Sequence, residues 1–340
     1  MVFPVPPRQV TFHDLLRGPI TVDTTLFNTL VLMKSDGLPT YNFACVVDDA
    51  LMRISHVIRG DDHIANTPKQ VVLYEALGWA LPVFAHLPLI VGADRARLSK
   101  RFGATSVEEY RRVGYLPEAL VNYLALLGWA PGGNRELITP QELIELFDLS
   151  HVRKTAAYFD QRKLDWLNSQ YIKRTPVPQL AEWLAERLVA KGWLPAQYDR
   201  PWLERIAALL QDRLRVLEEI EEEHAFFFQD PPPYQEEAVQ QWLRADGMAA
   251  RLRALRDRLR ALPAFETGTV ETATRAFMAE RQLQAKEVIH PVRVALTGRA
   301  VSPPLFETMA ILGQERVLRR LEHAAQVANT ASVEKPPESG

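Results

Sequence analysis

The segment from Ala96 to Ala104 contains residue types that suit it to binding phosphate groups. It reads Ala-Arg-Leu-Ser-Lys-Arg-Phe-Gly-Ala, so Ser99 and Lys100 stand between two arginines, the first of which is Arg97. A lysine on a loop is a mobile point charge that can reach a polyphosphate and neutralise charge on a leaving pyrophosphate. The alternative is a basic surface loop without a ligand, and the rest of the chain must decide between the two.

Arg59 is a second residue that suits a charged ligand. A guanidinium binds a carboxylate through two parallel hydrogen bonds and stays charged when it is buried. The residues that follow it are Gly-Asp-Asp-His, and another acidic residue precedes it at Asp48. Arg59 could therefore bind a carboxylate ligand, or it could form an ion pair within the protein with Asp48, Asp61 or Asp62.

Alternating strands and helices are predicted around these groups. The aromatic and β-branched residues of Tyr41–Val47 predict a buried strand, and Ile54–Ile58 predicts another. A helix capped near Thr67 and ended by Gly78 follows, and Leu87–Val91 predicts a third strand. This alternation indicates a parallel α/β sheet, whose ligands bind at the carboxyl ends of the strands. Both candidate groups follow a strand, so we expect them to face one crevice.

The chain beyond Gly103 has a helical pattern. Apolar spacing predicts a helix over 116–127, and Thr139-Pro140-Gln141-Glu142 fits a capping box. Other helices are predicted over residues 160–167, 178–191, 201–223, 235–262, 269–285 and 303–326. Residues 1–20 are rich in proline and are interpreted as a tail or a remnant of something larger.

Four motifs together resemble bacterial-type glutamyl-tRNA synthetase, a class I aminoacyl-tRNA synthetase. They are Ser35 to Asp49, Val57 to His63, Asn66 to Gln70 and Ala96 to Ala104, and they occur in the family's order. The last one matches the second class I signature, Lys-Met-Ser-Lys-Ser, which this family usually spells Lys-Leu-Ser-Lys-Arg. Arg97 replaces the usual first lysine, so the charge is kept but a planar fork replaces a point charge. The resemblance runs from about residue 20 to about residue 325.

The resemblance implies a partial Rossmann-type α/β domain, followed by an all-α helical connector and anticodon-binding region. Residues 1–20 would be the remnant of the acceptor-stem-binding insertion, 21–104 the C-terminal half of the catalytic domain, 105–170 the connector that contacts the tRNA stem, 171–326 the α-helical anticodon-binding region, and 327–340 a disordered tail. Helical periodicity argues against the relatives that charge glutamine, which carry β-barrels in that region. The family's N-terminal His-Ile-Gly signature is not found at its usual place, so we expect the N-terminal half of the catalytic domain to be missing.

The resemblance also implies a reaction, the ATP-dependent activation of L-glutamate and its transfer to the 3′ end of tRNA(Glu). Lys100 would grip the phosphates of ATP, and Ser99 and Arg97 would shape the same catalytic loop. Mg²⁺ is expected to accompany ATP. The alternative is a catalytically inert fragment that binds tRNA, which would bind RNA without forming an adenylate. A small-molecule ligase on the same scaffold is a third hypothesis, and the long helical region argues against it.

The same resemblance assigns the two substrates to particular side chains. Tyr41 and Arg59 would contact the substrate glutamate. Asp62, Ile90 and Lys100 would contact ATP. From their sequence surroundings alone, Tyr41 and Ile90 would be core residues of strands, and Asp62 would be a partner of Arg59 or of the next helix N-terminus.

Composition excludes several other classes of protein. Cys45 is the only cysteine, which excludes a disulfide within the chain and a thiolate zinc cluster, so no zinc site is expected. No run approaches the roughly 20 apolar residues of a membrane span, and we expect a cytoplasmic protein with no membrane partner. The formal net charge is −2, so any contact with RNA must use local basic patches.

Two groups of arginines are the candidates for such patches. The first follows the helical leucines of one segment and comprises Arg251, Arg253, Arg256, Arg258 and Arg260; the second comprises Arg316, Arg319 and Arg320. Each group could contact tRNA phosphates, with a steep dependence on salt. Each could equally be the solvated face of an amphipathic helix.

Overall fold

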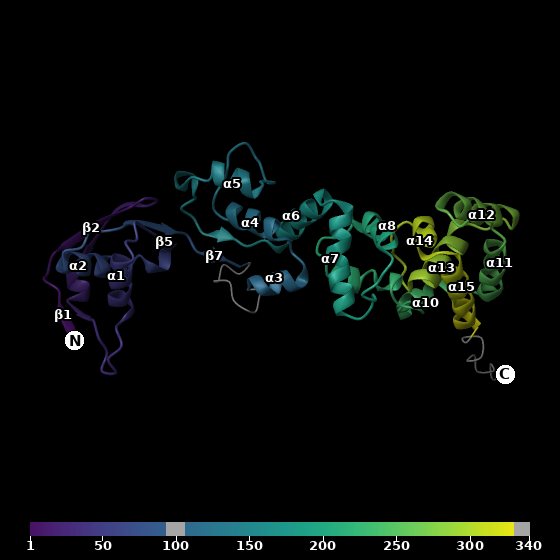
Figure 1. The fold of residues 1–340 in the computed structure, drawn as a ribbon, viewed down its shortest axis with the longest axis horizontal. Helices are drawn as coiled ribbons and strands as arrows, with labels where there is room; N and C mark the ends of the chain where they lie inside the picture. The colour runs from purple at the N-terminus through teal and green to yellow at the C-terminus, as the bar shows by residue number, and fades with distance from the viewer. Residues whose placement is uncertain (93–105, 330–340) are drawn as a thin grey trace, which may run out of the picture. The chain divides into compact units, whose positions relative to one another are not determined.

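The computed structural model describes residues 1–92 and 106–329. The chain forms two compact units, of which the first contains residues 1–111 and 116–167 and the second contains residues 112–115 and the chain from Asn168 onward. Figure 1 labels their helices and strands along the chain. Each unit is described by itself below.

The first unit begins with a mixed four-stranded sheet in the order β3-β2-β6-β5. Its strands are β2 (Gln9–Asp14), β3 (Gly18–Asp23), β5 (His56–Gly60) and β6 (Val83–Leu87). β6 runs parallel to β2 and β5, whereas β2 and β3 form an antiparallel hairpin. The interpretation of residues 1–20 as a tail is therefore wrong, because Val10 and Phe12 alternate inward along β2 and enter the core. The prediction of an all-parallel sheet is wrong at the same hairpin.

Two short pairs of strands accompany this sheet. β1 (Val2–Pro4) pairs with β4 (Thr29–Val31) in antiparallel fashion, and β7 (Ile90–Val91) pairs with β8 (Ala157–Tyr158) in parallel. The strand predicted over residues 87–91 is thus divided between the end of β6 and β7. Pro88 lies at the break, where its missing N–H cannot take part in a ladder of hydrogen bonds.

Two helices contribute to the same core as the sheet, α1 (Tyr41–Leu51) and α2 (Thr67–Leu77). α2 ends as predicted, because Gly78 takes the left-handed conformation at φ 69°. The strand predicted over Tyr41–Val47 is wrong. Phe43, Val46 and Ala50 recur at helical spacing and pack on the core, so the helical period outweighs the β-rich composition.

Helices make up most of the remainder of the first unit. They are α3 (Val107–Val113), α4 (Pro117–Leu126), α5 (Pro140–Leu146) and α6 (Gln161–Arg174), of which α3 and α6 each extend across the boundary between the units. The capping box predicted at the start of α5 is confirmed. The Thr139 hydroxyl accepts from the Glu142 backbone N–H, and the Glu142 carboxylate accepts from the Thr139 N–H. Trp129, Ile138 and Leu143 form the core beneath it.

The described helices of the second unit beyond α6 are α7 (Val177–Ala190), α8 (Arg200–Leu210), α9 (Glu219–Glu222), α10 (Glu236–Trp242), α11 (Met248–Arg260), α12 (Thr267–Glu280), α13 (Ala285–Thr297), α14 (Leu305–Leu312) and α15 (Gln314–Asn329). The predictions over 201–223, 235–262 and 303–326 each cover two helices. α13 was not predicted because Pro291 interrupts its pattern, yet the helix continues through it. Among the described residues, none of the helices has the length and apolar character to cross a membrane.

Candidate functional site

Arg59 lies on β5 and its guanidinium is held by uncharged groups. Its Nε donates to Nε2 of His86 at 3.2 Å, and its Nη2 donates to Thr67 Oγ1 and Gln70 Oε1, both at 2.7 Å. Asp61, one of the carboxylates that could have neutralised it, instead accepts from Arg17 at 2.6 Å. These contacts fix the guanidinium and leave its charge available, which favours the interpretation of Arg59 as a carboxylate-binding residue.

Tyr41 lies beside this guanidinium, at the first position of α1. Its hydroxyl is 3.2 Å from Nδ1 of His63, and the centres of the two rings are 5.6 Å apart. Burial and the neighbouring Cys45 raise the pKa of Tyr41, and the positive charge of Arg59 acts in the opposite direction. Tyr41 therefore keeps its proton at neutral pH, and its hydroxyl can donate or accept a hydrogen bond next to Arg59.

Asp62 and Ile90, predicted to contact ATP, lie on different elements. Asp62 is an exposed residue of the 3₁₀ turn Asp61–His63. Its carboxylate lies against Gly60, where an added Cβ would come within 2.6 Å of Asp62 Oδ1 and would displace the carboxylate. Ile90 lies on β7, in register with Ala157 of β8.

Three of the predicted residues lie outside the described part of the chain. These are Arg97, Ser99 and Lys100 of the phosphate-binding loop. The expectation that Arg59 and Lys100 face one crevice therefore stays a prediction. The structure does bring Tyr41 and Arg59 together, and it adds His63 to them.

Two buried residues behind Arg59 were not singled out in the sequence. His86 of β6 and Asp14 of β2 are both fully enclosed, and Nδ1 of His86 lies 2.6 Å from Asp14 Oδ2. Burial and the positive charges of Arg59 and Arg17 lower the pKa of His86, and together they outweigh the opposite effect of Asp14. Burial raises the pKa of Asp14, but hydrogen bonds from His86 and from the backbone N–H groups of Arg17 and Leu16 bring it below its usual value. The pair is therefore a carboxylate with a neutral imidazole.

The sequence held a signal for each of these two residues. His86 stands within the apolar run Val-Phe-Ala-His-Leu, and a polar side chain inside a buried strand requires a partner. Asp14 follows Val10 and Phe12 at the two-residue period of a strand, which places it on the same inward face. The partner itself could not be predicted, because 72 positions separate the two residues.

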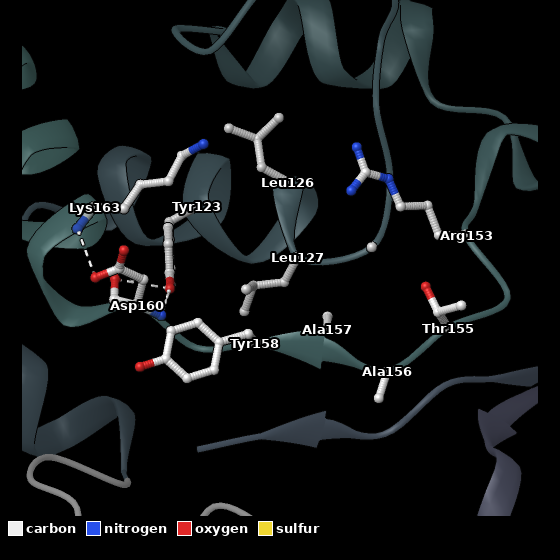
Figure 2. A pocket seen from close by; sticks show the side chains of 11 residues that line it. Tyr123, Leu126, Leu127, Arg153, Thr155, Ala156, Ala157, Tyr158, Asp160 and Lys163 are labelled. Carbon is white, nitrogen blue, oxygen red and sulfur yellow. Dashed lines mark hydrogen bonds between the residues drawn. The ribbon is translucent and has the colours of Figure 1, made fainter. Parts of the chain in front are cut away.

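A separate hollow of about 340 Å³ lies between α4 and β8 in the first unit. Figure 2 shows the Tyr123 hydroxyl against the backbone of Asp160, and Arg153 and Lys163 at different sides of the hollow. The hydroxyl accepts from Asp160 N at 2.6 Å and donates to its carbonyl at 2.9 Å. None of the residues predicted to bind glutamate or ATP lines this hollow, so it is distinct from the surroundings of Arg59.

The first group of arginines in the second unit is bound to acidic partners. The pairs are Arg251 with Glu287, Arg253 and Arg256 with Glu322, Arg258 with Glu280, and Arg260 with Asp257. An arginine and its acidic partner together carry little net charge, so each pair attracts an RNA phosphate less than a lone arginine would. This arrangement favours the interpretation of the α11 arginines as part of the amphipathic helix and its packing.

The second group surrounds one carboxylate. Arg316, Arg319 and Arg320 of α15 all form ion pairs with Asp230. Arg320 is 1% exposed and also donates to three backbone carbonyls, those of Leu296, Phe226 and Gln229. Arg320 is therefore a structural residue. Its donors are satisfied within the protein, where these partners replace the hydrogen bonds to water that are lost on burial.

Comparison with known families finds a match in each half of the chain. The family model described as tRNA synthetases class I (E and Q), catalytic domain, matches residues 3–166. The family model described as an anticodon binding domain matches residues 177–325. The fold and the matched regions thus place the chain among the class I synthetases for glutamate and glutamine.

Individual relatives narrow this class. The chain is 43% identical to a glutamate–tRNA ligase of Moorella thermoacetica over 92% of this chain and 64% of the relative, and 46% identical to one of Syntrophobacter fumaroxidans over 92% and 66%. A glutamate-tRNA synthetase structure from Elizabethkingia anophelis has a TM-score of 0.78 at 30% identity, and covers 95% of this chain and 67% of that one. The chain belongs to the glutamate–tRNA ligase family. It spans a little under two thirds of the length of the curated relatives it matches.

Proposed function

We propose that this chain carries the amino-acid site and the tRNA-binding region of a glutamate–tRNA ligase. The reaction would be the ATP-dependent activation of L-glutamate and its transfer to the 3′ end of tRNA(Glu). The observation that supports this proposal most is the state of Arg59, whose guanidinium is fixed by His86, Thr67 and Gln70 without losing its charge.

The side-chain carboxylate of glutamate would be bound by Arg59. Among the described residues, the protein engages Nε and Nη2, so the carboxylate would accept from Nη1 alone rather than from a fork of two nitrogens. The hydroxyl of Tyr41 would add a hydrogen bond from the start of α1. A neutral glutamine amide would lose the attraction to the guanidinium charge, so the site favours glutamate.

The nucleotide would be bound by Asp62 and Ile90 together with the loop of Arg97, Ser99 and Lys100. The α-carboxylate of glutamate would attack the α-phosphorus of ATP and release pyrophosphate, whose charge Lys100 would neutralise. Among the described residues, no group of three or more His, Cys, Asp or Glu side chains is arranged to hold a metal ion. The expected Mg²⁺ would be held chiefly by the phosphates of ATP.

The tRNA would be bound by residues 105–170 at its stem and by residues 171–326 at its anticodon. The match of residues 177–325 to an anticodon binding domain supports the second assignment. Arg153, which lines the hollow of Figure 2, is a candidate for a phosphate contact in the first region. Residues 1–20 would be what this chain has of the acceptor-stem-binding insertion, and a missing N-terminal half would complete the catalytic domain.

Binding of L-glutamate to the purified chain tests the amino-acid site. Isothermal titration should show that Arg59→Lys weakens binding at least about tenfold, because an ammonium cannot bond His86, Thr67, Gln70 and the substrate together. Arg8→Lys is the matched control, since Arg8 is an exposed arginine in an ion pair with Glu75. Equal affinities of wild type and Arg59→Lys for glutamate would refute the assignment.

Adenylate formation tests the reaction itself. ATP–pyrophosphate exchange that requires L-glutamate would support a ligase that is active as this chain. Binding of tRNA with neither exchange nor binding of glutamate would show instead an inert tRNA-binding fragment.

A further inference from the structure

We propose that Asp14 and His86 form a buried dyad that positions Arg59 by fixing the tautomer of the imidazole. The inference rests on the proposed glutamate site and assigns it two positioning residues. Neither residue would touch the substrate. Each would act through the next, from carboxylate to imidazole to guanidinium.

Hydrogen-bond polarity determines the tautomer. An ionised carboxylate can only accept, so Asp14 Oδ2 at 2.6 Å requires a proton on Nδ1 of His86. A neutral imidazole then has a lone pair on Nε2, which accepts from Arg59 Nε, whereas the Thr67 hydroxyl donates to the carbonyl of His63. Arg59 Nε lies 3.2 Å away and Thr67 Oγ1 lies 3.0 Å away. The opposite tautomer would turn an N–H of His86 toward the N–H of Arg59.

Burial of the dyad excludes water as an alternative hydrogen-bond partner, and this fixes the tautomer of His86. The side chains of Asp14 and His86 are both 0% exposed, so water cannot replace a lost partner. The second oxygen of Asp14 is also occupied, because Oδ1 accepts from the backbone N–H groups of Leu16 and Arg17, both at 2.9 Å. The carboxylate is thus anchored on the β2–β3 turn and cannot rotate to a different partner without leaving buried N–H groups unpaired.

The dyad determines where the free end of Arg59 lies. His86 holds Nε, while Thr67 and Gln70 hold Nη2, so three contacts define the plane of the guanidinium. Gln70 is itself oriented by Asn42 of α1, to which its Nε2 donates at 3.2 Å. A guanidinium fixed in this way loses little side-chain freedom when a carboxylate binds, which strengthens binding.

Asp14→Asn is the decisive substitution. Asparagine keeps the size of the side chain and an oxygen for Leu16 and Arg17, but it places an NH₂ group against His86 Nδ1. The imidazole must then carry its proton on Nε2, where it opposes Arg59. A comparable carboxylate-to-amide change disables a catalytic histidine by imposing the wrong tautomer.

We expect Asp14→Asn to weaken L-glutamate binding at least about tenfold in isothermal titration of the full chain. In ¹⁵N spectra of histidine-labelled protein, the protonated nitrogen of His86 should change from Nδ1 to Nε2. Asp23→Asn is the matched control, because Asp23 lies on the same hairpin and caps a turn at Thr25 without touching His86. It should leave both measurements unchanged.

Two variants of His86 separate positioning from packing. His86→Gln places an amide oxygen near Nε2 and keeps an acceptor for Arg59, whereas His86→Asn keeps a donor for Asp14 and loses that acceptor. Asparagine is one methylene smaller than glutamine, so His86→Asn should lower the melting temperature more, and glutamate binding is compared at a temperature at which both variants are folded. Glutamate binding should be weakened more in His86→Asn than in His86→Gln. Equal binding by these two variants, or wild-type affinity in a folded Asp14→Asn protein, would overturn the proposal.

The proposed function can fail independently of the dyad. If wild type does not bind L-glutamate, the amino-acid site is refuted. The ¹⁵N signal of Arg59 Nε then decides the positioning claim, because it must shift in Asp14→Asn if His86 controls this group. An unchanged Arg59 signal would overturn the claim.

Discussion

Acid should destabilise the second unit through His224. Burial, together with the positive charges of Arg299 and Arg213, lowers the pKa of this histidine to about 4. The residue is 6% exposed, and within the described part of the chain its Nδ1 is buried without a hydrogen-bond partner. Protonating this imidazole in the folded state would therefore place an unpaired charge inside the protein.

The magnitude follows from the difference between the folded and unfolded pKa values. An unfolded histidine has a pKa near 6.5, so the difference from about 4 corresponds to roughly 3 kcal/mol. The sign follows because the unfolded chain binds the proton first as the pH falls. The stabilisation is fully present above about pH 6.5, is lost as the pH falls from 6.5 to about 4, and changes no further below that.

Urea unfolding at pH 7.5 and pH 4.5, followed by circular dichroism, measures this loss. His224→Leu removes the titrating group and keeps an apolar side chain in place, so the variant should lose less free energy of unfolding between the two pH values than wild type. His13→Leu is the control, because His13 is exposed on β2 and loses little contact with water on folding. An equal loss in wild type and His224→Leu would refute the reasoning.

Three further substitutions test the packing and the caps, each by its free energy of unfolding in urea. Asp230→Asn should cost about 3 kcal/mol, because it leaves the buried charge of Arg320 without its carboxylate. Thr139→Ala should cost about 1 kcal/mol by removing the N-cap of α5. Gly298→Ala should cost more than Thr139→Ala, because the added Cβ would lie 2.0 Å from the Pro233 carbonyl oxygen at φ 73°. Wild-type stability in any of the three would contradict the corresponding contact.

Local signals predicted the local structure well. The capping box at Thr139 and the stop at Gly78 are confirmed, because a cap is formed by residues within a few positions of one another. The prediction of secondary structure was wrong where two sequence signals conflicted. At α1 the β-rich composition hid the helical spacing of Phe43 and Val46, and at α13 a proline hid a helix that the surrounding core supports.

The candidate site was predictable only in part. The sequence and the family resemblance gave Arg59 and Tyr41, and the structure places the two side chains near each other. The sequence could not show that neutral groups hold Arg59, because His86 and Gln70 come from separate elements. Asp14 lay within the residues interpreted as a tail or a remnant of something larger, since a hairpin of β2 and β3 becomes evident only from strand pairing.

The position of Asp14 would make the N-terminal hairpin a part of the proposed glutamate site. β2 joins β6 in parallel with Asp14 opposite Phe84, which lies two residues before His86 and on the same face of β6. A slip of one residue between these strands would turn the carboxylate to the other face of the sheet and release the imidazole. Cleavage or fraying of the first twenty residues would therefore loosen Arg59 from a distance, with every residue around the guanidinium still intact.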